Sequence, residues 1–267
     1  MPIDTYKRKI NYLRVSVTDK CNYRCQYCRP AEGVPLKNHK DILSLEEIYD
    51  IVKFFVQAGF EKVRLTGGEP LVRKNIIFLV KNIAALPGLK DFGLTTNGSL
   101  LSHFAESLYS AGLKRINISL DTLNPDKFKF LTRGGELGDV IKGIKAAQDV
   151  GFYPIKINTV VLKDFNEDDI DDIKQFCKEN KLILRLIKEM NLKKGTRYVI
   201  ENAEAGQCEI CNRLRLTCDG RLKPCLFSDY AIDIRKISLE KALEQALHNK
   251  PEFGTANALD YMVQIGG

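Results

Sequence analysis

The feature that most constrains the fold of this chain is a regular alternation of short β-rich segments and longer helical ones over its first 190 residues. Segments rich in β-branched residues predict strands, and the segments between them place apolar residues at helical spacing. Each helical segment is long enough to cross over between two parallel strands. The predicted strands are 12–19, 62–68, 92–98, 115–122, 154–162 and 181–190, and the predicted helices are 44–59, 75–86, 102–112, 138–151 and 167–180.

These six units are too few to close the eight-unit barrel that this kind of repeat also builds. The fold class that the sequence predicts is therefore α/β, as a partial, open βα barrel of about six units. In such folds the functional site lies at the carboxyl ends of the strands. The unusual residues of the chain fall at those ends, in segments 21–28, 67–70, 95–98, 119–122 and 188–190.

The last part of the chain breaks this rhythm and predicts a small second module. Residues 208–227 predict a hairpin-like unit held by cysteines, with its turn at Asp219-Gly220. Residues 238–249 predict one capped amphipathic helix, and the chain ends in two glycines. The predicted domains are thus the barrel, 1–190, and the C-terminal module, 191–267.

The composition is that of an ordinary globular protein and argues against several classes. With 267 residues and 44% hydrophobic content, the chain can bury a full core. No apolar run approaches the length of a membrane span, and no signal peptide is visible, so we expect a cytoplasmic protein that binds no membrane. The net charge of +7 comes without a run of lysines and arginines, which does not favour nucleic acid.

The chain has eight cysteines, and six of them form two sets of three. In a reducing compartment such sets predict metal ligands rather than disulfides. Thiolate is the preferred ligand of iron–sulfur clusters and of zinc, and three thiolates leave one position of a cluster open for a non-protein ligand. The first set is Cys21, Cys25 and Cys28, and the second set is Cys208, Cys211 and Cys225.

Structural zinc is the alternative for both sets, and a closed zinc site needs four ligands. None of the three histidines of the chain stands at ligand spacing. Cys218 could complete a zinc site with the second set, but its place just before the predicted turn favours a small structural residue, and we leave it out of the cluster. Cys177 falls on the apolar face of the predicted helix 167–180, so we expect it in the core.

The first cysteine set, with Tyr27 before its last cysteine, resembles the radical S-adenosylmethionine (SAM) superfamily, and so does the "GGEP" of residues 67–70. The resemblance then narrows to the GTP 3′,8-cyclase family of molybdenum-cofactor biosynthesis. The segments that carry it run in family order along nearly the whole chain. They are "YLRVSVTDKCNYRCQYCRP", "KVRLTGGEPLVRK", "TTNG", "RINISLDTL", "KINTVVL", "CEICNRLRLTCDGRLKPCLF" and the terminal "IGG".

This resemblance implies two 4Fe-4S clusters, SAM and the substrate GTP. One open iron would take SAM and the other the guanine end of GTP. Cations on barrel strands support an anionic substrate, because they would be costly there without an anion. The implied SAM-binding residues are Tyr27, Gly68, Ser119 and Met190. The implied GTP-binding residues are Arg14, Lys62, Arg64, Thr95, Lys156, Arg185, Arg213, Leu214 and Arg215.

The implied activity is that of a lyase that cyclises GTP to (8S)-3′,8-cyclo-7,8-dihydroguanosine 5′-triphosphate, the first step of molybdopterin biosynthesis. The implied partners are an electron donor such as flavodoxin or ferredoxin and a second copy of the chain in a homodimer. Two features depart from the family: the connector 191–207 is short, and Lys188-Glu189 stand where an acid and an apolar residue are expected. Two alternatives stay open, a radical SAM enzyme acting on a sugar nucleotide or peptide, and a non-enzymatic electron carrier or zinc protein.

Overall fold

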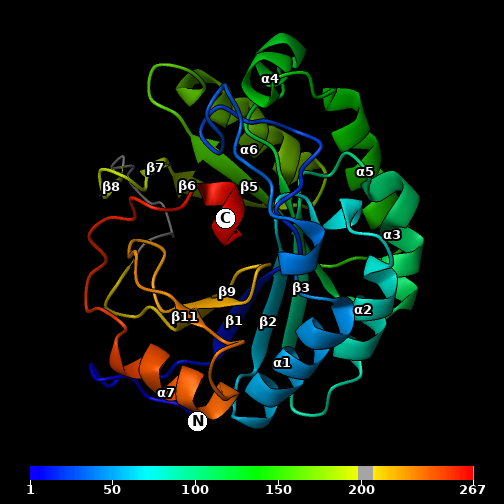
Figure 1. The fold of residues 1–267 in the computed structure, drawn as a ribbon. Helices are drawn as coiled ribbons and strands as arrows, with labels where there is room; N and C mark the ends of the chain where they lie inside the picture. Colours follow the sequence, from blue (N-terminus) through cyan, green and yellow to red (C-terminus); the bar gives the residue numbers. More distant parts are fainter. Residues whose placement is uncertain (198–206, 267) are drawn as a thin grey trace.

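The computed structural model describes residues 1–197 and 207–266, and it shows the predicted open barrel. Its main sheet has nine strands in the order β11-β10-β9-β1-β2-β3-β4-β5-β6. The first six strands of the chain are parallel neighbours in chain order, with helices on the outer face of the sheet (Figure 1). These strands are β1 (Tyr12–Ser16), β2 (Lys62–Thr66), β3 (Asp91–Thr96), β4 (Arg115–Ser119), β5 (Ile155–Val161) and β6 (Ile183–Lys188).

Every predicted strand and helix of the barrel is present. The helices between the strands are α1 (Leu45–Gln57), α2 (Ile76–Ala84), α3 (Leu101–Ser110), α4 (Pro125–Thr132), α5 (Leu137–Asp149) and α6 (Ile170–Glu179), with short 3-10 turns η1 (His39–Asp41), η2 (Pro70–Val72) and η3 (Glu167–Asp169). Helix α1 shows why the pattern predicts well: Ser44 and Glu47 form the expected capping box. Among the described barrel helices the prediction missed α4, although Asn124 caps its first turn and proline occupies its first position.

The strands separate an apolar face from a polar one. Residues such as Leu13, Val63, Leu94 and Ile157 are fully or almost fully buried and pack in the main core under the helices. Side chains alternate along a strand, so their immediate neighbours point into the barrel instead. Cys177 on α6 is 3% exposed and belongs to this core, as expected.

The cysteine-bearing hairpin continues the barrel sheet rather than standing apart from it. Strand β9 (Arg213–Leu216) pairs in parallel with β1, and β10 (Arg221–Lys223) and β11 (Ile232–Asp233) follow as antiparallel neighbours. Helix α7 (Leu239–His248) packs against this extension. The two predicted domains therefore share one sheet, and a boundary at residue 190 stays a prediction.

The C-terminal tail enters the interior of the barrel. The last helix, α8 (Met262–Ile265), is drawn in red between β6 and the first strands (Figure 1). The Gly266 carbonyl accepts hydrogen bonds from Thr66 Oγ1 on β2 and Arg215 Nη1 on β9, both at 3.2 Å. Gly267, the last of the two predicted terminal glycines, and most of the connector lie outside the described residues. None of the described helices combines the length and the apolar character needed to span a membrane.

Candidate active site

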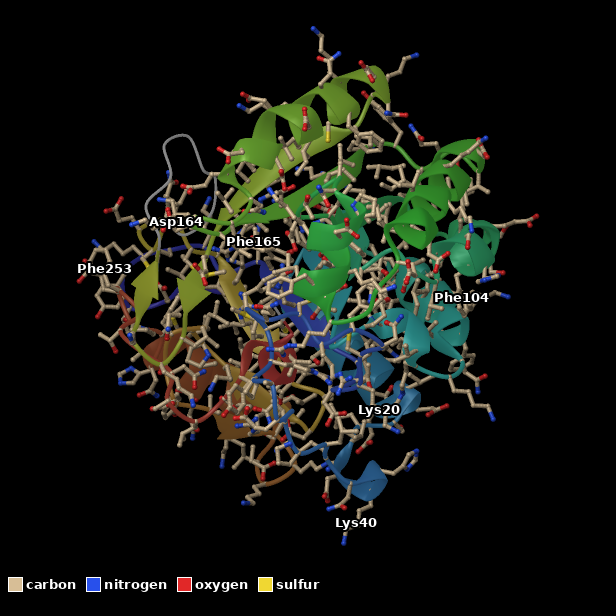
Figure 2. All side chains as sticks on the ribbon, turned by 90° about the horizontal axis from the view of Figure 1, so that it is seen from above. Lys20, Lys40, Phe104, Asp164, Phe165 and Phe253 are labelled. Atoms are coloured by element: carbon tan, nitrogen blue, oxygen red, sulfur yellow. The ribbon has the colours of Figure 1, made fainter. Side chains whose placement is uncertain are left out.

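The first cysteine set lies on the loop that leaves β1 at its carboxyl end. Figure 2 looks onto the molecule from above and labels Lys20, the residue before Cys21. The Gly68 N–H donates to the Thr18 carbonyl at 2.7 Å, and a side chain on Gly68 would collide with the backbone of Lys20. Glycine is thus needed here because the β2 loop packs directly against the start of the cysteine loop.

The three thiols of this loop are close enough to influence one another. Burial raises the pKa of each, and the neighbouring thiols raise those of Cys25 and Cys28 further, that of Cys28 to about 12. Three half-buried thiolates side by side are therefore unfavourable by themselves, and a bound cation would stabilise them. Hydrogen bonds already point at the sulfurs: Cys21 Sγ accepts from the Tyr23 N–H, and Cys28 Sγ accepts from the backbone of Val263 in the tail.

A buried carboxylate that the sequence analysis missed lies behind this loop. Glu69 is 1% exposed and accepts hydrogen bonds from the Leu71 N–H, the Thr96 hydroxyl and the Asn97 N–H. The Asn97 side chain in turn reaches Cys21 Sγ at 3.9 Å. Burial raises the pKa of Glu69 to about 7 in spite of these donors. The "GGEP" motif was the signal that could have singled out this residue.

The raised pKa of Glu69 predicts a pH-dependent stability of the metal-free protein. Because the folded-state pKa of about 7 exceeds the ordinary value of 4.5, folding binds a proton between these two pH values. The stability that this group contributes is fully present below pH 4.5 and is lost as pH rises from there through 7, by about 3 kcal/mol. Glu69→Gln should flatten this dependence. Urea unfolding at several pH values measures it, and an equal slope in both proteins would contradict the assignment.

A second buried carboxylate holds Tyr27, one of the predicted SAM-binding residues. Asp121 follows β4 and accepts a hydrogen bond from the Tyr27 hydroxyl at 2.8 Å and another from the Val160 N–H at 2.7 Å. Burial raises the pKa of Asp121 to about 6. The contact fixes the cysteine loop to the ends of β4 and β5, close to the predicted Ser119.

Most of the predicted GTP-binding residues lie on one face of the sheet. In the register of the strands Arg215, Arg14, Arg64 and Gly93 are successive neighbours. Registered neighbours in a parallel sheet point to the same side, so the three arginines form a row across the inner face of the barrel. A side chain at Gly93 would collide with the Arg64 guanidinium, so glycine leaves the room that this arginine occupies.

The remaining polar positions continue this inner face toward the other edge of the barrel. Thr95 and Lys156 flank Asn117, while Ser119, Asn158 and Arg185 stand side by side two residues further along their strands. Lys62 and Arg213 flank Tyr12 two residues before the arginine row. Leu214 is different, because its side chain is fully buried on the apolar face beside Leu13. The structure therefore does not bring the Leu214 side chain to the site.

Several buried polar atoms on this inner face have no hydrogen-bond partner among the described residues. They are Arg64 Nε, Arg185 Nε, Thr95 Oγ1 and Asn158 Oδ1. Buried polar groups in folded proteins are almost always paired, so unpaired ones gathered on one face indicate a ligand. Asn117 and Asn158 are further polar residues of this face that the sequence analysis did not select.

The second cysteine set surrounds a small cavity at the amino end of β9. The cavity has a volume of 100 Å³ and is lined by all three cysteines together with Met190, Arg213 and Arg215. A side chain on Gly254 would approach Cys225 Sγ to 2.7 Å, so glycine leaves space beside this ligand. Cys218 is 1% exposed, and its carbonyl accepts from the Leu43 N–H in the loop before α1.

Both sets fit iron–sulfur clusters. Cys28 of the first set lines a cavity of 320 Å³, and all three cysteines of the second set line one of 100 Å³. Three thiolates suit a cluster that keeps one iron open, whereas a closed structural zinc site needs four ligands. Cys21, Cys25 and Cys28 would hold the first cluster, and Cys208, Cys211 and Cys225 the second.

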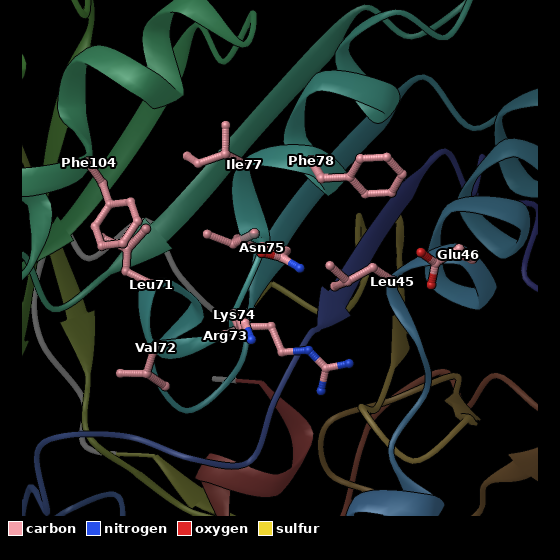
Figure 3. A pocket seen from close by; sticks show the side chains of 11 residues that line it. Leu45, Glu46, Leu71, Val72, Arg73, Lys74, Asn75, Ile77, Phe78 and Phe104 are labelled. Carbon is pink, nitrogen blue, oxygen red and sulfur yellow. The ribbon is translucent and has the colours of Figure 1, made fainter.

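Met190 connects the two cysteine sites. It lines the cavity of the second set and also a cavity of 320 Å³ beside Tyr27 and Cys28 of the first set. A larger groove of 740 Å³ lies elsewhere, between α1, η2 and α2 on the helical side of the sheet (Figure 3). Its walls carry side chains such as Phe78 and Phe104 and, among the described residues that line it, no cysteine. We therefore place the chemistry in the two smaller cavities.

An ion-pair cluster holds the base of the tail that reaches this site. Asp260 accepts from Lys223 Nζ and Arg221 Nη2, both at 2.8 Å, and Lys223 is fully buried. Asn257 caps the same turn through the Asp260 N–H at 3.0 Å. Since Lys223 and Arg221 belong to β10, the hairpin that carries Cys225 also fixes the tail.

Asp260→Asn should release the tail. Breaking a buried ion pair leaves an uncompensated cation and costs about 3 to 5 kcal/mol. We expect a lower melting temperature and faster removal of the C-terminal residues by carboxypeptidase. Lys236→Met is the matched control, because it breaks an exposed pair with Asp233 on β11 and should change stability by less than about 1 kcal/mol. Equal digestion rates for both variants would contradict the anchoring role.

A parallel open barrel with three cysteines on the loop after its first strand defines a radical SAM enzyme. Residues 15–177 match the model of the radical SAM superfamily, and residues 163–254 match that of the molybdenum cofactor synthesis C-terminal region. Solved structures share the fold: Streptococcus suis SuiB has a TM-score of 0.65 over 92% of this chain and 67% of its own, at 17% identity. Native anSMEcpe with bound AdoMet has a TM-score of 0.62, at 15% identity, over 90% of this chain and 81% of its own.

Curated relatives narrow the assignment. The chain is 41% identical to the GTP 3′,8-cyclase of Peptoclostridium acidaminophilum over 318 positions, covering 99% of this chain and 98% of the relative. It is 43% identical to that of Moorella thermoacetica, covering 87% and 86% of the two chains. The chain belongs to the GTP 3′,8-cyclase family of the radical SAM superfamily. This membership confirms the resemblance on which the sequence analysis rests.

Proposed function

We propose that this protein converts GTP to (8S)-3′,8-cyclo-7,8-dihydroguanosine 5′-triphosphate, the first step of molybdopterin biosynthesis. The observation that carries the proposal is the row Arg215–Arg14–Arg64 on the inner face of the barrel. This row begins on the hairpin of the second cysteine set and continues onto β1, the strand that leads into the first set. A polyanionic nucleotide bound along it would lie between the two predicted clusters.

The electrostatics of the row support a triphosphate. Burial and, after it, the charges of Arg14 and Arg213 together lower the pKa of Arg215 to about 9. Burial alone would raise the pKa of Tyr12, but Arg14 and Arg64 bring it down to about 8. Among the described residues neither Arg213 nor Arg215 has a carboxylate within ion-pair distance. Buried guanidinium groups without a carboxylate partner favour a phosphate ligand, which they can bind through paired hydrogen bonds.

The first cluster and SAM, when bound, supply the radical that takes hydrogen from C3′ of the ribose. The protein's part is to bind, orient and exclude water. Tyr27, held by Asp121, and Met190 line the cavity of 320 Å³ beside the first set. Gly68, after β2, and Ser119, at the end of β4, would contact SAM from the carboxyl ends of these strands. Burial raises the pKa of Glu69, and a positive charge close by would lower it again and keep the carboxylate ionised. The site therefore favours a ligand with a cationic group, as SAM has.

The second cluster and the tail complete the substrate side. The open iron of this cluster would bind the guanine end of GTP, with Arg213 and Arg215 beside it. The C-terminal tail contacts Cys28 through Val263 and Arg215 through the Gly266 carbonyl, so it connects the two sides of the site. Thr95, Lys156, Arg185 and Lys62 would contact the phosphates or ribose from the inner face, and Leu214 only through its backbone.

The chain is shorter than its relatives. Its alignment with the Peptoclostridium enzyme spans 318 positions, whereas the chain has 267 residues, so at least 51 positions of that relative have no counterpart here. We place this difference in the short connector between Met190 and Cys208. Both cysteine sets and the arginine row are retained, which supports the same chemistry.

Further parts of the proposal concern the setting of the enzyme. None of the eight cysteines forms a disulfide, which supports a reducing cytoplasm. Reduction of the first cluster would need an external one-electron donor such as flavodoxin or ferredoxin. A barrel of residues 1–190 with a module of 191–267, and a homodimer, also remain predictions. Size-exclusion chromatography with light scattering tests the dimer.

Anaerobic reconstitution with iron and sulfide, followed by dithionite, SAM and GTP, tests the proposed function. We expect 5′-deoxyadenosine and the cyclised nucleotide in equal amounts. Formation of 5′-deoxyadenosine without a cyclised nucleotide would favour the alternative of another substrate, a sugar nucleotide or a peptide. About two zinc ions per chain and no acid-labile sulfide would instead indicate a zinc protein.

A further inference from the structure

Lys250 is a buried lysine outside every motif of the sequence analysis. It follows α7 and is 2% exposed. Its Nζ donates to the Pro224 carbonyl at 2.7 Å, to the Arg213 carbonyl at 2.8 Å and to Cys211 Sγ at 3.5 Å. The ammonium has three hydrogens, and each finds an acceptor. A fully hydrogen-bonded ammonium is the form in which a protein can bury this charge.

The acceptors of Lys250 belong to both arms of the second cysteine set. Arg213 is two residues after Cys211, and Pro224 directly precedes Cys225. The first arm, with Cys211, leads into β9, and the second arm, with Cys225, follows β10. The two strands pair antiparallel, so the arms lie at the same end of the hairpin. A single ammonium therefore connects the two ligand-bearing arms at the point where a cluster would sit between them.

Arg8 fixes the backbone at Cys208, the remaining cysteine of the second set, and the segment that carries Lys250. Its Nη1 donates to the Cys208 carbonyl at 2.8 Å and to the Glu252 carbonyl at 3.0 Å, and its Nη2 donates to the Pro251 carbonyl at 2.8 Å. Asp4 pairs with its Nε at 2.6 Å. Arg8 thus has a carboxylate partner, but Lys250 has none within ion-pair distance among the described residues. The sulfurs of Cys211 and Cys225 are the anionic groups that Lys250 faces.

We propose that Lys250 is a positioning residue of the second cluster, which holds the arms of Cys211 and Cys225 together and raises the reduction potential of the cluster. This inference rests on the proposed function in so far as the second set holds a 4Fe-4S cluster. A cluster bound by thiolates gains negative charge on reduction, and a buried cation touching a ligand sulfur stabilises the more negative state. Hydrogen bonds to ligand sulfurs act in the same direction.

The test is a redox titration of reconstituted holoenzyme followed by electron paramagnetic resonance, with iron and sulfide analysis. Lys250→Met removes the charge and keeps the length of the side chain. We expect one of the two cluster signals to shift to a more negative midpoint potential, while the other is unchanged and serves as an internal reference. Lys241→Met is the matched control, because it removes an exposed lysine from α7 and should leave both potentials at the wild-type values.

Two unchanged midpoint potentials in Lys250→Met, at wild-type iron and sulfide content, would overturn the inference. If this variant does not fold, Lys250→Gln replaces it, because glutamine keeps a hydrogen-bond donor without the charge. The same shift of the midpoint potential is expected. Selective loss of one cluster from either folded variant supports the positioning role. A wild-type protein that binds only one cluster would contradict the second cluster itself. This outcome is distinct from the failure of the proposed role of Lys250, in which both clusters are present.

Discussion

Cys28→Ser is expected to abolish the formation of 5′-deoxyadenosine. The serine hydroxyl is a poor ligand for iron, so the first cluster would be lost or would no longer accept SAM in the right geometry. The loss should exceed the roughly 10- to 100-fold reduction that changes around a metal site produce. The measurement is the yield of 5′-deoxyadenosine per chain after anaerobic reconstitution with dithionite and SAM. Iron content should fall as well, because the second set alone remains intact.

Cys218→Ala is the matched control for this change. Cys218 is also buried, at 1% exposure, but its contact to Leu43 uses the backbone, which alanine keeps. We expect wild-type iron content and a wild-type yield of 5′-deoxyadenosine. A wild-type yield from Cys28→Ser would contradict the assignment of the first cluster, and loss of iron from Cys218→Ala would make Cys218 a ligand.

Arg64→Met is expected to weaken GTP binding by about 10- to 100-fold, the effect of losing charged hydrogen bonds to a phosphate. Arg64 is 7% exposed, and the contacts that hold it are to Asn117 Oδ1 at 3.3 Å and to Asp91 at 3.8 Å. Methionine can fill much of the same volume without the charge. Equilibrium dialysis of reconstituted protein with labelled GTP measures the affinity, and SAM binding should stay within about twofold of wild type, because the substitution removes no charge from the SAM side.

Arg115→Met is the matched control for Arg64. Arg115 lies beside Gly93 on the same sheet and pairs with the same Asp91, at 2.9 Å, but its side chain is 34% exposed at the amino ends of the strands. We expect its GTP affinity to stay within about twofold of wild type, because this partly exposed pair lies at the amino ends of the strands and contributes little. Equal losses in both variants would point to a general effect of Asp91, and no loss in Arg64→Met would remove the arginine row from the substrate site.

The strand–helix order was predictable from the sequence because each element has its own local signal. Apolar periodicity located the barrel helices, and the cap at Ser44 set the start of α1. Helix α4 was missed because Pro125–Thr132 is short and weakly amphipathic, although the Asn124-Pro125 start was visible. The parallel pairing of β9 with β1 joins residues about 200 positions apart, and no local pattern encodes it.

In the candidate site, too, residues with a local sequence pattern were predictable and residues defined by their burial were not. The cysteine spacings and the strand-borne arginines were visible in the sequence. Glu69, Asp121 and Lys250 were not selected, because an acid or a lysine is ordinarily exposed and only the fold shows that these are buried. Leu214 was selected next to two arginines, although the alternation of side chains along a strand places it on the opposite face.

A radical generated at the first cluster is expected to act on a nucleotide held by the arginine row. The experiment is to incubate GTP deuterated at C3′ of its ribose with reconstituted enzyme, SAM and dithionite. Mass spectrometry should find deuterium in the 5′-deoxyadenosine that is released. Unlabelled 5′-deoxyadenosine, formed at the same rate with or without GTP, would show that the hydrogen comes from elsewhere and that GTP is not the substrate.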